Sequence, residues 1–503
     1  MRRPRHTLIP IAAGALALMT AVAGCSGIQS NSAPAGAPGG APAPSPAGQP
    51  GANPRGGDRD GFNPEISTDE EPTSSFAIDV DTASYAYTRR QILDGRRPDR
   101  SAVRPEEFIN YFRQDYRQPG GEGFTVTMDG AALPPRHEIA EADRYRLLRV
   151  GLQTRADTSV RSDVALTFVV DVSGSMGEAG RLDLVRDALH YLIDQLRSSD
   201  HVAIVAYDDE ARVLREMTEL SNRRALHGAV DDLEPGGSTN LEDGLVRGYQ
   251  VARDGFVRGA SNRVILLSDG LANVGNTDAD PILEQIREEA DKEIALLGVG
   301  VGSQYGDALM ERLADNGDGF VTYVSELEQA KRLFVERLPM ALIVRALDAK
   351  VQVSFVPSTV ATYRLIGYDN RVIANEDFRD DRVDGGEVGP GHSVTALYLI
   401  RLRDGVNGDV ATATVRWLHP QTREASEVTD RLNVGDLDRS LASASVRLRV
   451  DYAAAYFAEV LRGSQYGDEV TLAMLAELAE GAARETDDGD VADLAALIRR
   501  AGD

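Results

Sequence analysis

The sequence predicts an α/β fold with a doubly wound, mostly parallel sheet, inserted in a β-sandwich-like flanking domain that ends in a helical segment. Strand-like and helix-like patterns alternate over residues 163–340, which is typical of parallel strands joined by helices. Strand-like patterns alone occupy residues 124–155 and 346–436, on the two sides of that region. Helical periodicity dominates residues 441–503.

Residues 1–25 have the pattern of a secretory signal peptide. The basic stretch MRRPRH precedes the apolar stretch TLIPIAAGALALMTAVAG, and Cys25 follows directly. The sequence Val22-Ala23-Gly24-Cys25 resembles a bacterial lipobox, which implies cleavage before Cys25 and lipidation of that residue. An ordinary signal peptide or a transmembrane anchor is the alternative. Because Cys25 is the only cysteine, we expect a protein lipid-anchored to the membrane of the cell envelope, outside the cytoplasm.

Residues 26–72 are expected to form a disordered linker. Gly, Pro and Ala dominate the stretch APAGAPGGAPAPSPAGQPGANPRGG, and such a composition cannot bury an apolar core. No later stretch has about 18 consecutive apolar residues, as a membrane-spanning helix requires. The N-terminal lipid is therefore the one membrane attachment that we expect.

Residues 73–162 are expected to form an N-terminal flanking domain. The stretch FAIDVDTASYAYTRRQILDG begins as a strand and becomes helical after Asp81 or Thr82, and RPEEFINYF begins a second helix at its proline. Two strands follow within residues 124–134 and 144–155. Because two strands alone are marginal in water, we expect them to pair with strands from another part of the chain.

Residues 163–340 are expected to form the α/β domain. Residues 163–171, DVALTFVVD, are almost continuously apolar, as in a parallel strand that is covered on both faces. Residues 181–200 have apolar side chains at helical spacing. Further strands are expected at 201–208, 211–217, 263–270, 294–302 and 320–324, and further helices at 221–232, from 240, 278–292, 306–314 and 326–338.

Residues 341–503 are expected to form a C-terminal domain, β-rich over 346–436 and helical over 441–503. The β-rich part contains stretches such as SVTALYLIRLR and VATATVRWLH, which alternate like strands of an antiparallel sheet. These strands need a covering layer, and so do the two strands before the α/β domain. We therefore expect the two flanks to fold as one unit, with the α/β domain as an insertion.

Three polar segments of the α/β domain contain candidate metal ligands. Asp171, Ser173 and Ser175 follow the first strand, Thr239 lies in PGGSTNLEDGL, and Asp269 ends VILLSDG. In doubly wound sheets, ligands bind beyond the carboxyl ends of the strands, so we expect these segments to meet. Two carboxylates and three hydroxyls suit Mg²⁺, Ca²⁺ or Mn²⁺ and do not suit zinc.

Each of these residues also has a simpler explanation. Ser173 and Ser175 could cap the helix that follows, and Thr239 or Asn240 could cap the next one. Asp269 and Gly270 could form a plain turn. The metal site becomes the better prediction only when the five residues are considered together.

The same residues resemble the von Willebrand factor type A family. Asp171, Ser173 and Ser175 match its DxSxS motif, and Thr239 and Asp269 match its later threonine and aspartate. In that family these positions form the metal-ion-dependent adhesion site. The resemblance implies binding to a protein partner that presents an acidic side chain to the cation.

The flanking sequences resemble a narrower group of bacterial envelope lipoproteins. The stretches IDVDTASYAYTRRQ and TYRLIGYDNRVIANEDF carry this resemblance. In that group a von Willebrand factor type A domain lies between an N-terminal von Willebrand-associated segment and a C-terminal domain of unknown function. The resemblance implies the architecture and assigns no chemistry to the flanks.

Composition and motifs disfavour other functions. The net charge of −25 argues against a nucleic acid partner, because phosphate binding needs a basic surface. Asp79 and Asp81 suggest a phosphatase motif, but the threonine comes one position too early, so a helix cap with an acidic turn or a second cation site are the alternatives. We therefore expect that the protein is not an enzyme. An assembly or maturation factor that works with an ATPase partner is the second hypothesis.

Overall fold

The computed structural model describes residues 62–133, 144–156, 163–269, 294–301, 313, 320–324 and 344–502, except 382, 384, 421 and 469. Cys25, the predicted signal peptide and most of the predicted linker lie outside these residues. The expected helices at 278–292, 306–314 and 326–338 also lie outside them, apart from residue 313. Among the described helices, none has the length and apolar character that crossing a membrane requires.

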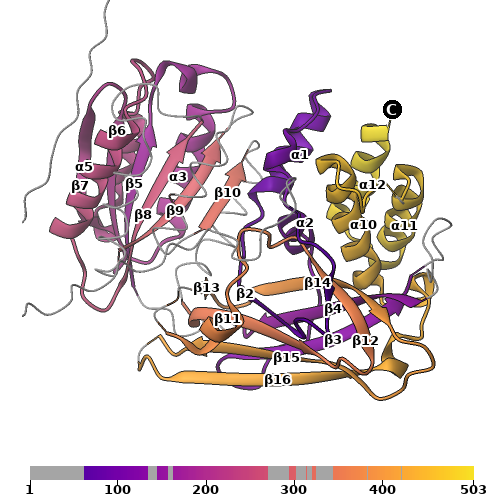
Figure 1. The fold of residues 1–503 in the computed structure, drawn as a ribbon. Helices are drawn as coiled ribbons and strands as arrows, with labels where there is room; N and C mark the ends of the chain where they lie inside the picture. The colour runs from indigo at the N-terminus through magenta and orange to yellow at the C-terminus, as the bar shows by residue number, and fades with distance from the viewer. Residues whose placement is uncertain are drawn as a thin grey trace, which may run out of the picture. The chain divides into compact units, whose positions relative to one another are not determined.

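The α/β domain contains a six-stranded sheet with the order β10-β9-β8-β5-β6-β7 (Figure 1). The pairs β10–β9, β9–β8, β8–β5 and β5–β6 are parallel, and only β7 runs antiparallel to its neighbour β6. The predicted doubly wound, mostly parallel sheet is confirmed. Its strands are β5 (Val164–Asp171), β6 (His201–Tyr207), β7 (Ala211–Glu219), β8 (Ser261–Ser268), β9 (Ile294–Val301) and β10 (Phe320–Val324).

Helices cover both faces of this sheet, because alternate side chains of each strand point to opposite sides. Phe168 and Ile204 pack with α3 (Leu182–Gln195) and α4 (Arg223–Asp231) on one face. Val169 and Val205 pack with α5 (Leu241–Asp254) on the other face. Burial on both faces accounts for the continuous apolar run of β5, in which every residue is buried.

Two antiparallel sheets form the flanking domain. The first has the order β1-β12-β14-β4-β3, and the second has the order β13-β11-β15-β16 with β2 paired to β11. The strands are β1 (Ile66–Ser67), β2 (Thr73–Ala77), β3 (Phe124–Ala132), β4 (Tyr145–Thr154), β11 (Ala346–Phe355), β12 (Val360–Ile366), β13 (Gly386–Val388), β14 (Ser393–Leu402), β15 (Asp409–Leu418) and β16 (Ala425–Asn433).

Strands from before and after the α/β domain pair within both flanking sheets. β4 pairs with β14, with Val150 opposite Ala396, and β2 pairs with β11, with Phe76 opposite Val351. Buried side chains from both sheets share one apolar core, which includes Trp417. The predicted insertion of the α/β domain in a β-sandwich-like domain is therefore confirmed.

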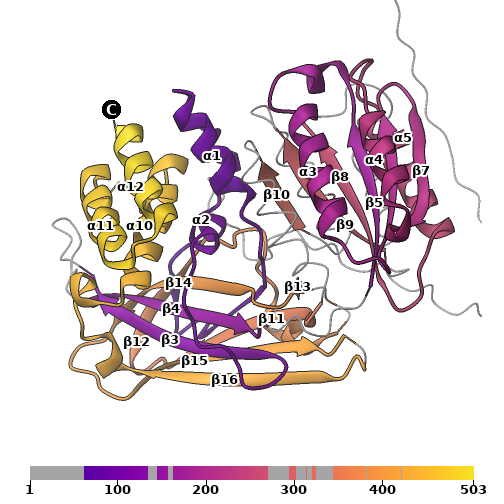
Figure 2. The same cartoon turned by 180° about the vertical axis from the view of Figure 1, so that it is seen from behind.

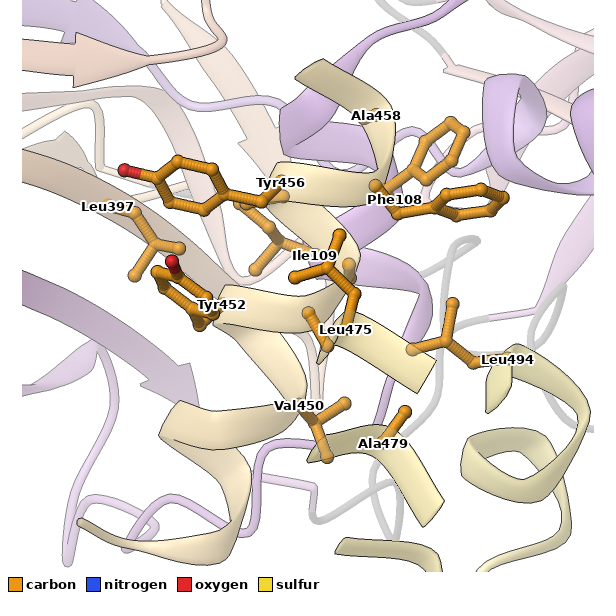
Figure 3. Close-up of a cluster of buried hydrophobic side chains, with 14 of the residues drawn as sticks. Phe108, Ile109, Leu397, Val450, Tyr452, Tyr456, Ala458, Leu475, Ala479 and Leu494 are labelled. Atoms are coloured by element: carbon orange, nitrogen blue, oxygen red, sulfur yellow. The ribbon is translucent and has the colours of Figure 1, made fainter. Parts of the chain in front are cut away.

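A helical layer covers the outer face of the first flanking sheet (Figure 2). Phe108 and Ile109 of α2 pack with Tyr456 of α10 and with Leu397 of β14 in one buried cluster (Figure 3). The central strands β4 and β14 are therefore covered on both faces. The helices are α1 (Ala83–Leu93), α2 (Pro105–Tyr111), α10 (Val446–Arg462), α11 (Leu472–Thr486) and α12 (Gly489–Gly502).

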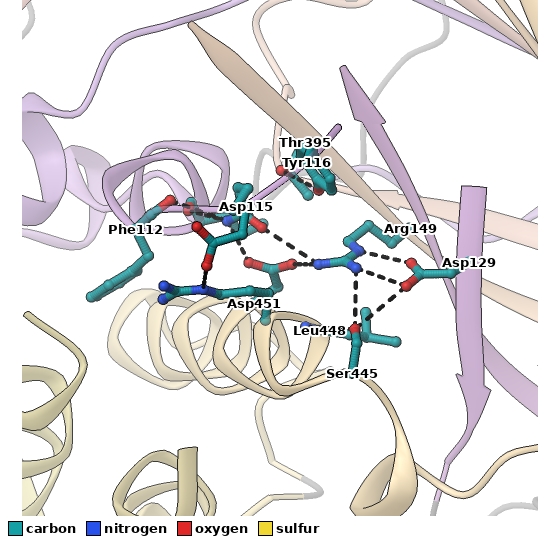
Figure 4. Close-up of polar contacts among 12 residues, drawn as sticks. Phe112, Asp115, Tyr116, Asp129, Arg149, Thr395, Ser445, Leu448 and Asp451 are labelled. Atoms are coloured by element: carbon teal, nitrogen blue, oxygen red, sulfur yellow. Dashed lines mark hydrogen bonds and ion pairs between the residues drawn. The ribbon is translucent and has the colours of Figure 1, made fainter. Parts of the chain in front are cut away.

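A buried ion pair network joins α10 to the first flanking sheet (Figure 4). Arg149 of β4 donates to Asp451 of α10 at 2.8 Å and to both carboxylate oxygens of Asp129 at 2.8 and 2.7 Å. Gln114 donates to the other oxygen of Asp451 at 2.7 Å. Because Arg149 and Asp451 are both buried, each needs the other to offset its desolvation.

Three expectations need correction. The linker does not extend to residue 72, because β1 pairs with β12 and β2 pairs with β11. The strand β16 was not expected, since its exposed side chains give no apolar alternation. Asp79 and Asp81 do not cap α1: its N-cap residue is Thr82, which makes no side-chain cap, and Asp79 instead accepts the Asp81 amide at 2.8 Å.

Short 3-10 helices complete the described secondary structure. They are Arg100–Ala102, Gly174–Gly177, Leu220–Asn222, Asn375–Arg379, Val434–Leu437 and Leu441–Ser443.

Candidate functional site

Sheet topology brings the candidate ligands Asp171 and Asp269 to one edge. Asp171 is the last residue of β5, and Asp269 directly follows Ser268, the last residue of β8. β5 and β8 are parallel neighbours, with Val170 opposite Leu267, so their carboxyl ends lie side by side. Ligand sites of doubly wound sheets form at this edge, where the strand order reverses.

The Asp171 carboxylate is buried and surrounded by hydrogen-bond donors. One oxygen accepts the backbone amide of Ser173 at 2.8 Å. The other oxygen accepts the hydroxyl of Ser268 at 2.7 Å and that of Tyr207 at 3.4 Å. Burial raises the pKa of Asp171, and the neighbouring Asp269 carboxylate acts in the same direction, while the hydrogen bonds from Ser268 and Ser173 oppose the rise.

The two serines link the strand ends. The hydroxyls of Ser173 and Ser175 are 3.1 Å apart, and Ser175 donates to Oδ1 of Asp269 at 2.9 Å. Neither serine acts as a helix cap: Ser173 precedes a 3-10 turn without a side-chain cap, and the N-cap residue of α3 is Arg181. The capping alternative is therefore wrong for both serines, whose hydroxyls face the carboxylate edge.

Thr239 reaches this edge through its loop. The amide of Gly236 donates to the carbonyl of Val172 at 2.7 Å, and the amide of Gly174 donates to the carbonyl of Gly237 at 3.1 Å. These bonds hold the segment before Thr239 against the Asp171–Ser175 loop. Thr239 itself is buried. It is not the helix cap, because Asn240 caps α5 by accepting the Asp243 amide at 3.3 Å.

Three residues of the site were not predicted from the sequence. Ser268 and Tyr207 orient Asp171, and both end strands that flank β5, so their position at a strand end was the available signal. Arg181 forms a buried ion pair with Oδ2 of Asp269 and donates to the Ser175 carbonyl at 3.0 Å. The sequence contains no spacing pattern from which the contact between Arg181 and Asp269 could be predicted.

The donors present fit a hard divalent cation. Asp171, Ser173, Ser175 and Asp269 form one connected set of oxygen atoms, and Thr239 lies on the loop bonded to it. Within the described residues, no group of three or more His, Cys, Asp or Glu side chains is arranged to hold a metal. A cation at this edge would therefore depend on the neutral hydroxyls as well as on the two carboxylates.

Asp79 and Asp81 form a second group of acidic residues, in the flanking domain. Asp79 and Asp81 are buried, and Asp79 pairs with Arg371 at 3.4 Å. This contact gives Asp79 a structural partner from the loop after β12. Trp417, Tyr363 and Tyr368 are also buried and belong to the apolar core of the flanking domain.

Three family models match the chain. The model described as von Willebrand factor type A domain matches residues 165–336. The model described as von Willebrand factor matches residues 59–140. The model described as the C-terminal region of uncharacterized protein YfbK matches residues 340–409 and 403–503.

Relatives cover the chain to different extents. Uncharacterized protein YfbK of Escherichia coli is 31% identical over 463 residues, which are 87% of this chain and 80% of that protein. Uncharacterized protein sll0103 of Synechocystis is 29% identical over 190 residues, 38% of this chain and 44% of that protein. A solved von Willebrand factor type A structure from Catenulispora acidiphila has a TM-score of 0.47 and 16% identity, covering 74% of this chain and 89% of that one. The chain therefore belongs to the YfbK family, with a von Willebrand factor type A domain between YfbK-like N- and C-terminal regions.

Proposed function

We propose that this protein binds a partner protein through a divalent cation held by Asp171, Ser173, Ser175, Thr239 and Asp269. All donors are oxygen atoms, which suit Mg²⁺ and equally Ca²⁺ or Mn²⁺. The observation that carries the proposal is the chain of contacts from Ser173 through Ser175 to Asp269, which joins the ends of two parallel strands. Von Willebrand factor type A domains generally mediate protein–protein interaction, often with a metal.

The neutral hydroxyl ligands explain why the role would be binding rather than catalysis. The hydroxyls of Ser173, Ser175 and Thr239 add no negative charge to that of the two aspartates, so the cation could still accept an acidic side chain of the partner. The protein's own task is to hold its ligands in place. Ser268 and Tyr207 do so for Asp171 through their hydrogen bonds.

The proposed location is the cell envelope. Lipidation at Cys25 would tether the protein to a membrane, because several acyl chains on one residue anchor more firmly than one. The chain after Cys25 is rich in Gly, Pro and Ala, which would let the binding domain reach a partner above the bilayer.

The partner is tested by affinity capture from cell envelopes. The wild-type protein should recover a partner in the presence of Mg²⁺ and lose it with EDTA or with Asp171→Ala, because the cation would lack its buried carboxylate. Asp187→Ala is the matched control, since it removes an exposed aspartate of α3 in the same domain. Equal recovery of every partner under all four conditions would reject the proposal.

The anchor is tested separately by fractionation. Cys25→Ser removes the thiol that would be acylated, so the protein should move from the membrane fraction to the soluble fraction, and metabolic labelling with a fatty acid should be lost. Wild-type levels of labelling in Cys25→Ser would show that the lipid is absent from this residue.

A further inference from the structure

Arg181 places a permanent positive charge inside the proposed metal site. Its side chain is 5% exposed. One guanidinium nitrogen contacts both Oδ2 of Asp269 and the carbonyl oxygen of Ser175, the latter at 3.0 Å. A guanidinium stays charged at every physiological pH. A cation that binds beside Asp269 therefore meets a fixed charge of the same sign.

Helix stability does not explain this arginine. Arg181 is the N-cap residue of α3 and makes no side-chain cap. Hydroxyl and acidic side chains are favoured at that position, because the helix dipole places positive charge there. An arginine at this end opposes the dipole. Its presence points to a different role.

The interaction with Asp269 dominates the environment of Arg181. The second guanidinium nitrogen pairs with Glu178 at 2.7 Å, but the Glu178 side chain is 67% exposed, so water screens that pair. Asp269 is buried, and charges interact more strongly where water is excluded. The positive charge of Arg181 therefore acts mainly on the carboxylate of Asp269, which is a ligand in the proposed site.

Both oxygens of Asp269 are already engaged. Oδ1 accepts the Ser175 hydroxyl at 2.9 Å, and Oδ2 faces Arg181. Asp171, by contrast, is held by neutral donors from Ser173, Ser268 and Tyr207. Arg181 and a metal ion thus compete for the charge of Asp269, while Asp171 has no such competitor.

We propose that Arg181 sets the charge of the metal site, so that the site binds its cation more weakly and the loaded site attracts an acidic ligand more strongly. This inference rests on the proposed function. Counting its buried charged side chains alone, Asp171, Asp269 and Arg181, the site has a formal charge of −1. A divalent cation changes this to +1, which favours a carboxylate of the partner. Without Arg181 the loaded site would be neutral.

Calorimetric titration of the full chain with Mn²⁺ tests whether Arg181 weakens cation binding. Arg181→Met should bind Mn²⁺ about tenfold more tightly than the wild type, because one unit of repulsion is removed from a buried site. Arg181→Gln keeps a donor for the Ser175 carbonyl and should tighten Mn²⁺ binding in the same way. It replaces the methionine variant if that variant does not fold. Arg181→Lys keeps the charge and should resemble the wild type.

Acetate, as a small carboxylate ligand, tests whether Arg181 strengthens the attraction of the loaded site for an acidic ligand. Acetate should displace water from the Mn²⁺-loaded protein, measured by water proton relaxation, and about tenfold more acetate should be needed in Arg181→Met than in the wild type. Arg253→Met is the control for net charge. Arg253 is an exposed residue in the last turn of α5, about 20 Å along the helix from Thr239.

The outcomes separate this inference from the proposed function. If the wild type binds Mn²⁺, Asp171→Ala abolishes binding and Arg181→Met has unchanged or weaker affinity, the charge-setting role is wrong and the metal site stands. The same conclusion follows if Arg181→Met and the wild type respond equally to acetate. If neither the wild type nor Arg181→Met binds Mn²⁺, both the proposed function and the inference are rejected.

Discussion

Glu106 carries a buried carboxyl group in the first turn of α2 and shows how single residues make this fold sensitive to pH. Its side chain is buried, and Oε2 has no hydrogen-bond partner. Burial raises the pKa of Glu106 to about 7, Asp369 and Asp79 act in the same direction, and Arg104 opposes them. The folded protein therefore holds a proton that the unfolded chain releases near pH 4.5.

This raised pKa predicts a loss of stability as the pH rises. Below about pH 4.5 Glu106 is protonated in the folded and the unfolded protein, so it does not change the free energy of unfolding with pH. Between about pH 4.5 and pH 7 the free energy of unfolding falls, because only the folded protein still holds the proton. Above about pH 7 Glu106 is ionised in both states, and the loss of stability stays constant. Glu106→Gln should match the wild type at pH 4 and be more stable at pH 8 by on the order of 3 kcal/mol. Denaturant unfolding across this pH range measures the difference.

The control for this prediction is Glu70→Gln, which neutralises an exposed glutamate of the same flanking domain. Its pH dependence of unfolding should equal that of the wild type. If Glu106→Gln has the same slope as the wild type between pH 5 and 7, the buried carboxyl is not the source of the pH dependence.

At the residue scale, the sequence predicts the candidate metal ligands but not the arginine that contacts one of them. The candidate ligands could be predicted because Asp171 and Asp269 follow apolar strands, and parallel strands end at a common edge. Arg181 could not be predicted, because a charged side chain at the start of a helix can extend in many directions. Only the folded chain shows that it meets Asp269, from a segment 88 residues away.

At the scale of elements, two glycines of α5 face the sheet and leave no room for a side chain. A Cβ atom at Gly248 would lie 2.3 Å from Cγ2 of Val169, and one at Gly244 would lie 2.7 Å from Cγ of Tyr207. Tyr207 also donates to Asp171. The absence of these two side chains therefore sets the position of the helix that begins directly after Asn240.

Glycine-to-alanine substitutions in α5 and α4 should change the stability of the α/β domain in opposite directions. Gly248→Ala should destabilise the α/β domain by about 1–3 kcal/mol, because the added methyl group meets Val169 in a tightly packed core. Gly228→Ala in α4 has open space around its new Cβ atom and should stabilise the domain by up to about 1 kcal/mol through helix propensity. Thermal unfolding of both variants measures the contrast, and destabilisation by both would contradict it.

Element prediction from the sequence depended on burial. The sequence predicts β5 because both of its faces are covered, which leaves an almost continuous apolar run. The sequence does not predict β16, because eight of its nine side chains are partly or fully exposed and only Leu432 is buried. An edge strand that packs so little against the core leaves almost no periodic pattern to detect.

At the scale of the whole molecule, the flanking domain is built from two separated halves of the chain. The ladder between β4 and β14 runs from Gln153 opposite Ser393 to Tyr145 opposite Arg401. The sequence could indicate that each half lacked a partner, but it could not give the register. Pairing between strands so far apart depends on the complete fold and not on local pattern.

This architecture predicts that the two halves complement each other when made as separate chains. Residues 62–156 and 344–503 should co-purify when expressed together, and neither should unfold cooperatively alone, because each lacks half of the shared core. Leu399→Pro should abolish co-purification, since proline removes an amide from the centre of β14, opposite Leu147. Independent cooperative unfolding of either half would contradict the prediction.

The hydrogen bond from the Thr154 hydroxyl to the carbonyl of Gly389 spans 235 residues of chain. During synthesis at about 5–20 residues per second, β3 and β4 would therefore wait roughly ten to fifty seconds for their partner strands. Their apolar faces are open to other chains during that interval. The α/β domain emerges complete within the same interval, so the order of translation favours an inserted domain that folds early and a surrounding domain that closes last.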